Sequence, residues 1–484
     1  VMYRLLNSVK WENKIKSDIE EFSSNIKEKF QLQKGIKSIQ EELTIFWNKY
    51  LDSEIYKNIS ISPIGNTLED IITQTEIYFS PSDTGGEDSS EKLSDGTRSL
   101  FYFTLISSLF SIENKLTNDD SDYGFEKEKI HAPTLSIFAI EEPENHLAPH
   151  YIGRVIKVLR SMLFTNRAQV VLTSHSPAIL KRIEPEEILY FRMEKNRESF
   201  IQNILLPKEI DDAYKYVKEA VKAFPELYFS RLVVLGEGDS EELIIPRLAN
   251  AFSIDIDTSF ISFVPLSGRF VNHFWKLLNN LKIPHITILD YDKGRTGGSA
   301  GRIKYICKQL IANGNSIVEV LSKNIKPDEL EAYHTKKLTE NEEKKIIKSL
   351  MKFNIFFSYP IDIDFLMLTH FPNEYQIIPE DASGPHIPDS TDIGYEKKVK
   401  SAIASVLKKD PAEIADISIF GNHINYFWYR YLFLNRSKPA SHLLALSKMK
   451  SEDLMKNSPD VLKELVRRIE ISLKNVDGLT SEVN

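Results

Sequence analysis

The sequence predicts an α/β fold, because apolar strands and helices alternate along it in two separate stretches. In the first, an apolar strand at 135–140 precedes a helix at 150–163 and a second apolar strand at 169–173. In the second, a new alternation begins with the apolar strand 232–235. Strand–helix–strand alternation is typical of parallel sheets, whose strands are buried on both faces. We therefore expect two α/β units with buried strands.

Composition agrees with a globular protein of two or three domains. The chain has 484 residues, of which 42% are hydrophobic and 27% charged, so disorder is excluded as its main state. The longest apolar runs, such as 100–110, are shorter than the roughly 20 residues that a membrane span needs. The single cysteine, Cys307, excludes an internal disulfide and fits a reducing cytoplasm, where we expect the protein to act. The net charge of −8 is weak evidence on nucleic acid binding.

The elements before the first alternation are mostly helical. Residues 8–50 carry apolar side chains at helical spacing, which predicts an amphipathic helix on a core or one arm of a dimerisation insertion. A strand, short helix and strand follow at 58–80, then a polar loop at 81–92, a helix at 97–113 and a charged loop at 117–130. The chain opens with Val-Met and has no signal peptide pattern, so we expect that N-terminal residues are missing from it.

After the first alternation we expect a β-hairpin at 186–206 and a helix at 208–224. The second unit then has strands at 232–235, 260–265 and 285–289, with helices at 240–251 and 271–281 between them. Residues 298–350 read as a helical insertion, 354–359 as a strand, and the aromatic cluster at 426–433 as core. The domain bounds predicted from this pattern are 1–55, 56–227, 228–445 and 446–484.

The first group of candidate site residues lies in the first unit. The strand at 137–140 ends in Glu141 and Glu142, a placement that suits a magnesium nucleotide. Upstream, Ser94 and Gly96 stand in Leu93-Ser-Asp-Gly-Thr-Arg98, where the start of a helix can cradle a phosphate. Downstream, the next strand runs into His175, at the sheet edge where ligands bind.

Taken in order, these motifs resemble the C-terminal lobe of SMC-like ATPases of the ABC class. The resemblance implies that Ser94 and Gly96 belong to the signature loop, that Glu141 and Glu142 are the Walker B pair with Glu142 as catalytic base, and that His175 is the switch histidine. It also implies ATP with Mg²⁺ as cofactor. Two departures stand out: Asp is commoner at the position of Glu141, and the chain has no G-x-x-x-x-G-K-[ST] loop. We expect that the first lobe is absent from this chain, the alternative being an inactive ATPase.

The second group lies in the second unit. The strand at 232–235 leads into Glu237, between two glycines, and Glu241 follows four residues later. The strand at 286–289 ends in Asp290 and Asp292, which strand alternation would place on one side. Carboxylates gathered at one sheet edge repel each other unless a divalent metal neutralises them, and oxygen ligands suit Mg²⁺ or Mn²⁺. We expect two such metals, which could stabilise the attacking and leaving oxygens of phosphodiester cleavage.

This pattern resembles the Toprim domain of topoisomerases, primases and related nucleases. The segment that follows Asp292 carries basic residues among glycines, which predicts a loop that contacts phosphates or, alternatively, a flexible solvent loop. Its basic residues are Lys293, Arg295, Arg302 and Lys304.

An SMC-like ATPase lobe joined to a Toprim domain resembles the OLD (overcoming lysogenization defect) family nucleases, which include those of Gabija-type and retron-associated anti-phage systems. The resemblance extends from about residue 58 to about residue 445. It implies a further metal-binding acid, Asp362 or Asp364, where the usual pattern is Asp-Leu-Glu. It also implies a lysine that stabilises the transition state, for which Lys438 is the best match, although a surface lysine beside a turn proline is the alternative.

The resemblance implies a metal-dependent DNA endonuclease or nickase governed by nucleotide state, with a role in anti-phage defence. Ser94 of one chain would cap nucleotide on another, so a homodimer or larger oligomer through the ATPase lobes and N-terminal helices is implied. A helicase or a reverse transcriptase–RNA complex could be a partner, and no membrane is involved. The alternatives are an SMC-like DNA repair ATPase, a primase or topoisomerase relative, and a non-catalytic scaffold.

Overall fold

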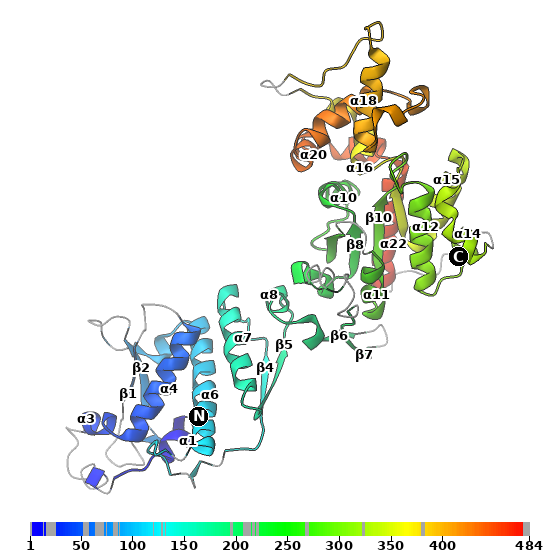
Figure 1. The fold of residues 1–484 in the computed structure, drawn as a ribbon. Helices are drawn as coiled ribbons and strands as arrows, with labels where there is room; N and C mark the ends of the chain where they lie inside the picture. Colours follow the sequence, from blue (N-terminus) through cyan, green and yellow to red (C-terminus); the bar gives the residue numbers. More distant parts are fainter. Residues whose placement is uncertain are drawn as a thin grey trace. The chain divides into compact units, whose positions relative to one another are not determined.

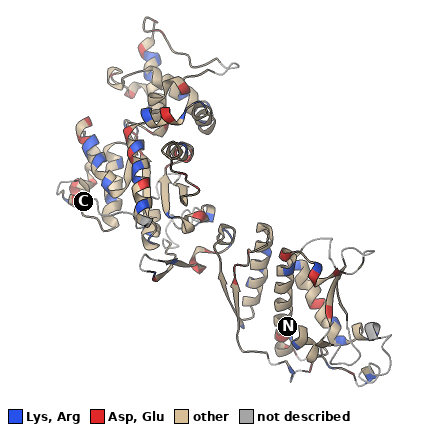
Figure 2. Cartoon of the chain, turned by 180° about the vertical axis from the view of Figure 1, so that it is seen from behind, with Lys and Arg blue, Asp and Glu red and all other residues tan. Residues whose placement is uncertain are grey.

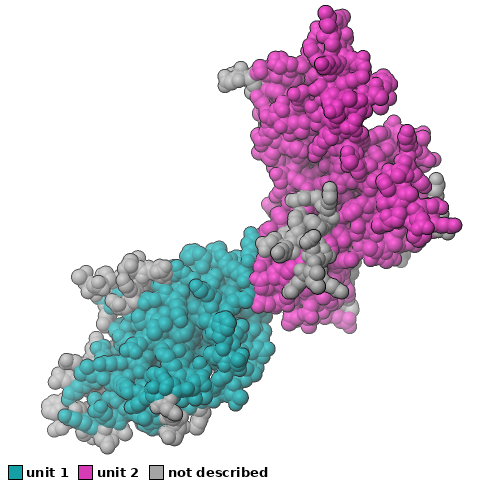
Figure 3. Space-filling view, in the orientation of Figure 1, with its two compact units in different colours: residues 1–183 teal, residues 184–484 magenta. Residues whose placement is uncertain are grey.

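The computed structural model describes residues 2–12, 14–15, 26–51, 58–62, 72–73, 75–80, 86, 88–119, 121–126, 129–130, 132–193, 197–206, 214, 218, 222–266, 271–321, 325–378 and 383–477. The chain forms two compact units, residues 1–183 and 184–484 (Figure 3). Each unit is an α/β structure of its own, and the predicted domain bounds stay predictions beside this division.

The first unit holds helices and two small sheets (Figure 1). Its helices are α1 (Met2–Asn7), α3 (Ile26–Gln31), α4 (Lys34–Tyr50), α6 (Asp95–Asn118), α7 (Pro149–Leu163) and α8 (Pro177–Leu180). An antiparallel sheet contains β1 (Asn58–Ser62), β2 (Glu76–Ser80) and β3 (Asp88–Ser89), and a parallel pair contains β4 (Ser136–Glu141) and β5 (Ala168–Thr173). The short helix expected at 68–72 lies largely outside the described residues.

Helix α4 uses its apolar stripe within the first unit. Ile39, Leu43 and Trp47 recur at helical spacing and are fully buried in the core that α6 and α7 share. Of the two interpretations of residues 8–50, packing on a core therefore describes α4. The expected helix is not continuous: Val9 forms an isolated bridge with Phe125, and α3 ends at Gln31, before α4 begins at Lys34. A dimerisation role for the preceding segment stays a prediction.

The strands β4 and β5 pair in parallel as expected, but their predicted burial is wrong. Exposed and partly buried residues alternate along both strands, and Ile137 and Val171 are 62% and 49% exposed. Helix α7 contacts β5, and the ring of Phe110 in α6 meets that of Phe138 in β4 edge to face, with centroids 5.3 Å apart. One face of the pair is thus covered, and the described residues leave the face of Ile137 and Val171 open.

The second unit is built on a four-stranded parallel sheet in the order β11-β10-β8-β9. These strands are β8 (Leu232–Gly236), β9 (Ile261–Pro265), β10 (His285–Asp290) and β11 (Ile355–Ser358), and the predicted hairpin is β6 (Leu189–Met193) with β7 (Ser199–Asn203). The main helices are α10 (Asp239–Ala251), α11 (Val271–Asn280), α12 (Ala300–Ala312), α13 (Ile317–Leu321), α14 (Pro327–Glu331), α15 (Glu340–Leu350), α16 (Ile363–His370), α17 (Pro372–Tyr375), α18 (Tyr395–Leu407), α19 (Ile424–Tyr429), α20 (Lys438–Leu446), α21 (Ser451–Asn457) and α22 (Asp460–Asp477). The helix expected at 208–224 lies mostly outside the described residues.

Helices cover both faces of this sheet, so its strands are buried as predicted. On one face, Val234 and Ile288 join a core with apolar residues of α10 and α22. On the other, the indole N–H of Trp275 in α11 donates a hydrogen bond to Thr287 Oγ1 at 2.9 Å. This fully covered sheet supports the acidic residues at its carboxyl edge.

The aromatic cluster belongs to the core, as expected. Tyr426, Trp428 and Tyr429 are each at most 6% exposed and pack with α16 and α18. Basic and acidic residues are interspersed on the helices of each unit (Figure 2). Among the described residues, no helix is long and apolar enough to cross a membrane.

Candidate metal and nucleotide sites

Five acidic residues gather where the parallel strands of the second unit end. Glu237 follows β8 and Glu241 lies in the first turn of α10, while Asp290 is the last residue of β10. Asp362 and Asp364 follow β11, at the start of α16. Neighbouring parallel strands place their carboxyl ends at one edge, where α/β proteins bind ligands. The backbone N–H of Asp290 donates a hydrogen bond to Glu237 Oε2 at 2.9 Å, which joins two of these strand ends directly.

Asp290 and Glu241 are the acids whose charge is least compensated. Burial, followed by the charges of Asp362, Glu241 and Glu237, raises the pKa of Asp290 well above its usual value. Its Oδ1 atom is buried and has no hydrogen-bond partner among the described residues. Burial likewise raises the pKa of Glu241 to about 8, although the backbone N–H of Gly238 donates a hydrogen bond to its Oε2. Neither carboxylate forms an ion pair within 4.0 Å in the part of the chain that the structure describes.

Asp292 was expected to lie on the same side as Asp290 because side chains alternate along a strand. Strand β10 ends at Asp290, and Asp292 adopts a positive φ of 56°, so the alternation argument does not apply to it. Its Oδ1 pairs with Arg295 at 2.8 Å and its Oδ2 with Arg302 at 2.5 Å. Burial acts to raise the pKa of Asp292, but these two arginines outweigh it and the pKa falls below the usual value.

Two arginines therefore lie within the acidic edge. Arg302 reaches from α12 to Glu237 Oε1 at 2.6 Å as well as to Asp292. Arg295 pairs with Asp362 at 2.7 Å and donates further hydrogen bonds to Tyr429 and to the carbonyl of Val406. The turn that delivers them needs Gly298, because a Cβ atom there would lie 1.8 Å from the carbonyl oxygen of Asp292.

Lys438 lies beside the same edge. It begins α20, and its Nζ atom is 2.6 Å from Asp364 Oδ2. His442, one turn later and fully buried, has Nε2 3.0 Å from Asp364 Oδ1 and Nδ1 2.7 Å from the hydroxyl of Tyr375. Because an ionised carboxylate only accepts, this geometry requires the Nε2–H form of His442. Burial acts to raise the pKa of Asp364, but His442 and Lys438 outweigh it and lower it.

The donor chemistry of this edge fits a hard divalent cation. Glu237, Glu241, Asp290, Asp362 and Asp364 offer oxygen atoms only, and the unpartnered Oδ1 of Asp290 lacks a cation or a donor. In the part of the chain that the structure describes, no group of three or more acidic, histidine or cysteine side chains is arranged to hold a metal ion. Among these acids and Asp292, only Asp292, Asp362 and Glu237 form ion pairs with arginines in the described part of the chain.

The metal-free protein is expected to lose stability as pH rises from about 4.5 to about 8, because of Glu241. Its pKa is 4.5 unfolded and about 8 folded, so within this window the folded state binds more protons than the unfolded state. Glu241→Gln keeps an acceptor for the Gly238 N–H and should reduce this loss. Urea unfolding in EDTA at several pH values measures it. Equal pH slopes for the two proteins would contradict the expectation.

In the first unit, the serine–glycine motif opens helix α6. Ser94 is the N-cap, and its Oγ accepts a hydrogen bond from the backbone N–H of Thr97 at 3.4 Å. A Cβ atom at Gly96 would lie 2.4 Å from the carbonyl oxygen of His146, so only glycine allows this approach. The helix start therefore lies beside the segment that follows the Glu141–Glu142 pair.

Glu142 and His175 meet at the ends of β4 and β5. His175 Nδ1 is 3.1 Å from Glu142 Oε1, and the side-chain amide of Asn145 donates to Glu142 Oε2 at 3.0 Å. The hydrogen bond from Asn145, followed by the charge of His175, lowers the pKa of Glu142. Glu144 accepts hydrogen bonds from the hydroxyl of Ser174 and the N–H of His175, so it holds the histidine segment in place.

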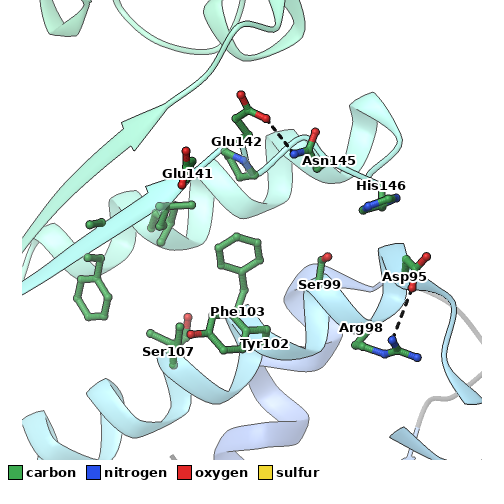
Figure 4. A pocket seen from close by; sticks show the side chains of 16 residues that line it. Asp95, Arg98, Ser99, Tyr102, Phe103, Ser107, Glu141, Glu142, Asn145 and His146 are labelled. Atoms are coloured by element: carbon green, nitrogen blue, oxygen red, sulfur yellow. Dashed lines mark hydrogen bonds and ion pairs between the residues drawn. The ribbon is translucent and has the colours of Figure 1, made fainter. Parts of the chain in front are cut away.

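A cleft of about 570 Å³ separates α6 from the end of β4. Figure 4 shows Glu141, Glu142, Asn145 and His146 on one side of it and residues of α6, such as Arg98, on the other. The predicted Walker B pair and the first turn of α6 thus line one cleft. His175 is within hydrogen-bond distance of Glu142.

Sequence reasoning missed several contacts of the acidic edge. It assigned the loop after Asp292 to phosphates or solvent, whereas Arg295 and Arg302 pair with acids, Lys293 pairs with Glu343, and Lys304 with Glu331. It did not single out His442, Tyr375 or Glu144, because a lone histidine, tyrosine or glutamate carries no motif. Their partners are up to 78 residues away, so no local spacing could have revealed them.

Comparison with known proteins finds a family model for a part of each unit. The OLD-like Toprim domain model (overcoming lysogenization defect protein-like) matches residues 228–292. A AAA domain model, whose description adds the AbiEii toxin of a type IV toxin–antitoxin system, matches residues 7–181. Among curated proteins, Endonuclease GajA of Bacillus cereus (strain VD045) is 23% identical over 235 residues, which are 47% of this chain and 39% of the relative. The match thus spans about two fifths of that relative.

Solved structures with detectable likeness include the C-terminal region of the Xanthomonas campestris pv. campestris OLD protein, at 17% identity and a TM-score of 0.29. That match covers 52% of this chain and 98% of the other. The C-terminal region of the Burkholderia pseudomallei OLD protein gives 17% identity and 0.29, covering 51% and 99%. The Smc head domain of Pyrococcus furiosus gives 15% and 0.25, covering 41% and 42%.

Proposed function

This chain joins the AAA-type ATPase domain and the Toprim domain of an OLD family protein, and from this premise we propose that it is a metal-dependent DNA endonuclease or nickase. The observation that carries the proposal is the acidic edge at the ends of β8, β10 and β11, with a buried, unpartnered Asp290 oxygen and Lys438 beside it. The similarity to Endonuclease GajA supports the same reaction class.

Different residues of the chain would bind the metal, accept a proton and stabilise charge during phosphodiester hydrolysis. Glu237, Glu241 and Asp290 would hold Mg²⁺ or Mn²⁺, with Asp364 contributing from the start of α16. When bound, the metal supplies Lewis acidity for the phosphate and activates water. Glu237, which is 18% exposed, can reach solvent and accept a proton. Lys438 holds its ammonium group against Asp364 at the rim, where it can stabilise the added negative charge of the transition state.

Nucleotide binding in the first unit would govern this activity. Ser94 and Gly96 at the start of α6 would contact a phosphate, Glu141 would orient Mg²⁺, and Glu142, hydrogen-bonded to His175, would be the catalytic base. Because signature motifs of this type act on a nucleotide held by another copy, we propose a homodimer or larger oligomer. Anti-phage defence in the bacterial cytoplasm, alone or with a helicase or a reverse transcriptase–RNA complex, is the role that fits this combination.

A cleavage assay on plasmid and linear DNA tests the proposal. The full chain is expected to nick or cut DNA with Mg²⁺ or Mn²⁺ and to be inactive in EDTA, and adding ATP should change the rate. The products are resolved on agarose gels. Absence of cleavage with either metal, in the presence and absence of ATP, would reject the nuclease and favour an SMC-like repair ATPase or a scaffold. Primer synthesis or DNA relaxation in place of cleavage would indicate a primase or topoisomerase relative.

A further inference from the structure

The acids of the metal edge form two sets that differ in how their charge is balanced. Asp292 and Asp362 pair with arginines, and so does the Oε1 atom of Glu237. Asp290 and Glu241 have no positively charged partner within ion-pair distance among the described residues, and the buried Oδ1 of Asp290 has no hydrogen bond. A divalent cation could therefore neutralise the side of Asp290 and Glu241, whereas arginines already neutralise the side of Asp292.

Arg302 lies between two carboxylates that come from different strands. Its Nη2 atom is 2.6 Å from Glu237 Oε1 and 2.5 Å from Asp292 Oδ2, and its Nε atom is 2.9 Å from the same Asp292 oxygen. One guanidinium thus bridges the end of β8 and the turn after β10. A divalent cation shared by Glu237 and Asp292 would have to bridge the same two residues, so the two cations compete for one position.

The surroundings hold Arg302 in this position. Its side chain is only 20% exposed, and it extends from the first turn of α12. Arg295 forms an ion pair with the other oxygen of Asp292. It also forms an ion pair with Asp362 and donates a hydrogen bond to the hydroxyl of Tyr429. Each oxygen of Asp292 already contacts an arginine, so binding a metal through either oxygen would cost Asp292 its contact with Arg295 or Arg302 in a mostly buried place.

We propose that this Toprim site holds one divalent cation, ligated on the side of Glu241 and Asp290, and that Arg302 takes the place of a second. The inference deepens the proposed function, since it concerns the same site, and it departs from the two metals expected from the sequence. Arg302 supplies a fixed positive charge beside Glu237. A guanidinium also suits phosphate oxygens, to which it can offer two parallel N–H donors.

Isothermal titration of the nucleotide-free full chain with Mn²⁺ measures the stoichiometry directly. We expect about one Mn²⁺ per chain that is lost in Asp290→Asn, which locates it at the acidic edge. Two Mn²⁺ per chain that are both lost in Asp290→Asn, or no Mn²⁺ that depends on Asp290, would overturn the inference. The count is independent of cleavage: one Mn²⁺ without DNA cutting would reject the proposed nuclease alone, and two with cutting would reject this inference alone.

Variants at position 302 test whether the arginine excludes the second cation. Arg302→Gln, which removes the charge, should bind a second Mn²⁺, whereas Arg302→Lys, which keeps it, should bind one. Lys308→Gln, on the same helix and paired only with the exposed Glu331, is the matched control and should behave as the wild type. If Arg302→Gln folds, as judged by its circular dichroism spectrum, and binds one Mn²⁺ like the wild type, the arginine is not the substitute. If Arg302→Gln does not fold, the numbers of Mn²⁺ ions bound by the wild type and by Arg302→Lys test the inference.

Discussion

Glu237→Ala is expected to abolish metal-dependent DNA cleavage while the protein remains folded. The side chain of Glu237 is partly exposed to solvent. Its Oε2 atom accepts a hydrogen bond from the backbone N–H of Asp290, which places Glu237 beside a proposed metal ligand. Losing a positioned acid–base group costs about 10²–10⁴-fold in rate, and loss of a ligand adds to this. Cleavage rates on supercoiled plasmid with Mg²⁺ and Mn²⁺ measure the effect, with circular dichroism as the test of folding.

The matched control for this variant is Glu242→Ala. Glu242 lies in the first turn of α10, five residues after Glu237, and is exposed; among the described residues it has no ion pair or hydrogen bond with a site residue. It should cleave DNA at the wild-type rate. Wild-type cleavage by folded Glu237→Ala with either metal would show that the acidic edge is not the catalytic site.

Asp290→Asn is expected to change activity and stability in opposite directions. Burial and the charges of its acidic neighbours disfavour the ionised form of Asp290 and raise its pKa, so removing its charge should stabilise the metal-free protein at neutral pH. The same change should slow cleavage by more than about 100-fold, since even the outer partners of metal ligands contribute about 10–100-fold. Thermal unfolding in EDTA and plasmid cleavage measure the two effects.

Adding Mn²⁺ distinguishes the loss of a metal ligand in Asp290→Asn from a change in packing alone. Saturating Mn²⁺ should raise the melting temperature of the wild type, because a ligand that binds only the folded state stabilises it, and should leave Asp290→Asn almost unchanged. Asp257→Asn, an exposed residue between α10 and β9, is the control and should match the wild type in all measurements. A destabilised Asp290→Asn that still responds to Mn²⁺ would contradict the assignment.

Much of the fold and the position of both candidate sites could be predicted from the sequence, because the signals are local. The apolar run of β8 and the acids that follow it are adjacent in the chain, as are β4 and the pair Glu141–Glu142. In a parallel sheet the carboxyl ends of the strands lie at one edge, so Glu237 and Asp290 were expected there, whereas the pairing of β8 with β10 that joins them was not predicted. The core role of the aromatic cluster was also expected from the sequence.

Contacts between residues far apart in sequence could not be predicted in this way. The alternation argument for Asp292 failed because β10 stops at Asp290 and the chain turns with a positive φ. The expectation that β4 and β5 are buried on both faces was wrong. An apolar run in the sequence does not specify which element packs on each face of the strand. His442 and Tyr375 reach Asp364 from helices whose packing no local pattern specifies.

The sequence by itself determined that this protein has two α/β units and which strand ends carry its acids, since apolar periodicity and charge placement are properties of short segments. Only the tertiary structure decided how those charges are balanced. Arg302 and Arg295 compensate Asp292 and Asp362, while Asp290 and Glu241 form no ion pair with the described residues. The reason is physical: electrostatic compensation depends on distances of a few ångströms between side chains, and those distances are set by packing of the whole unit.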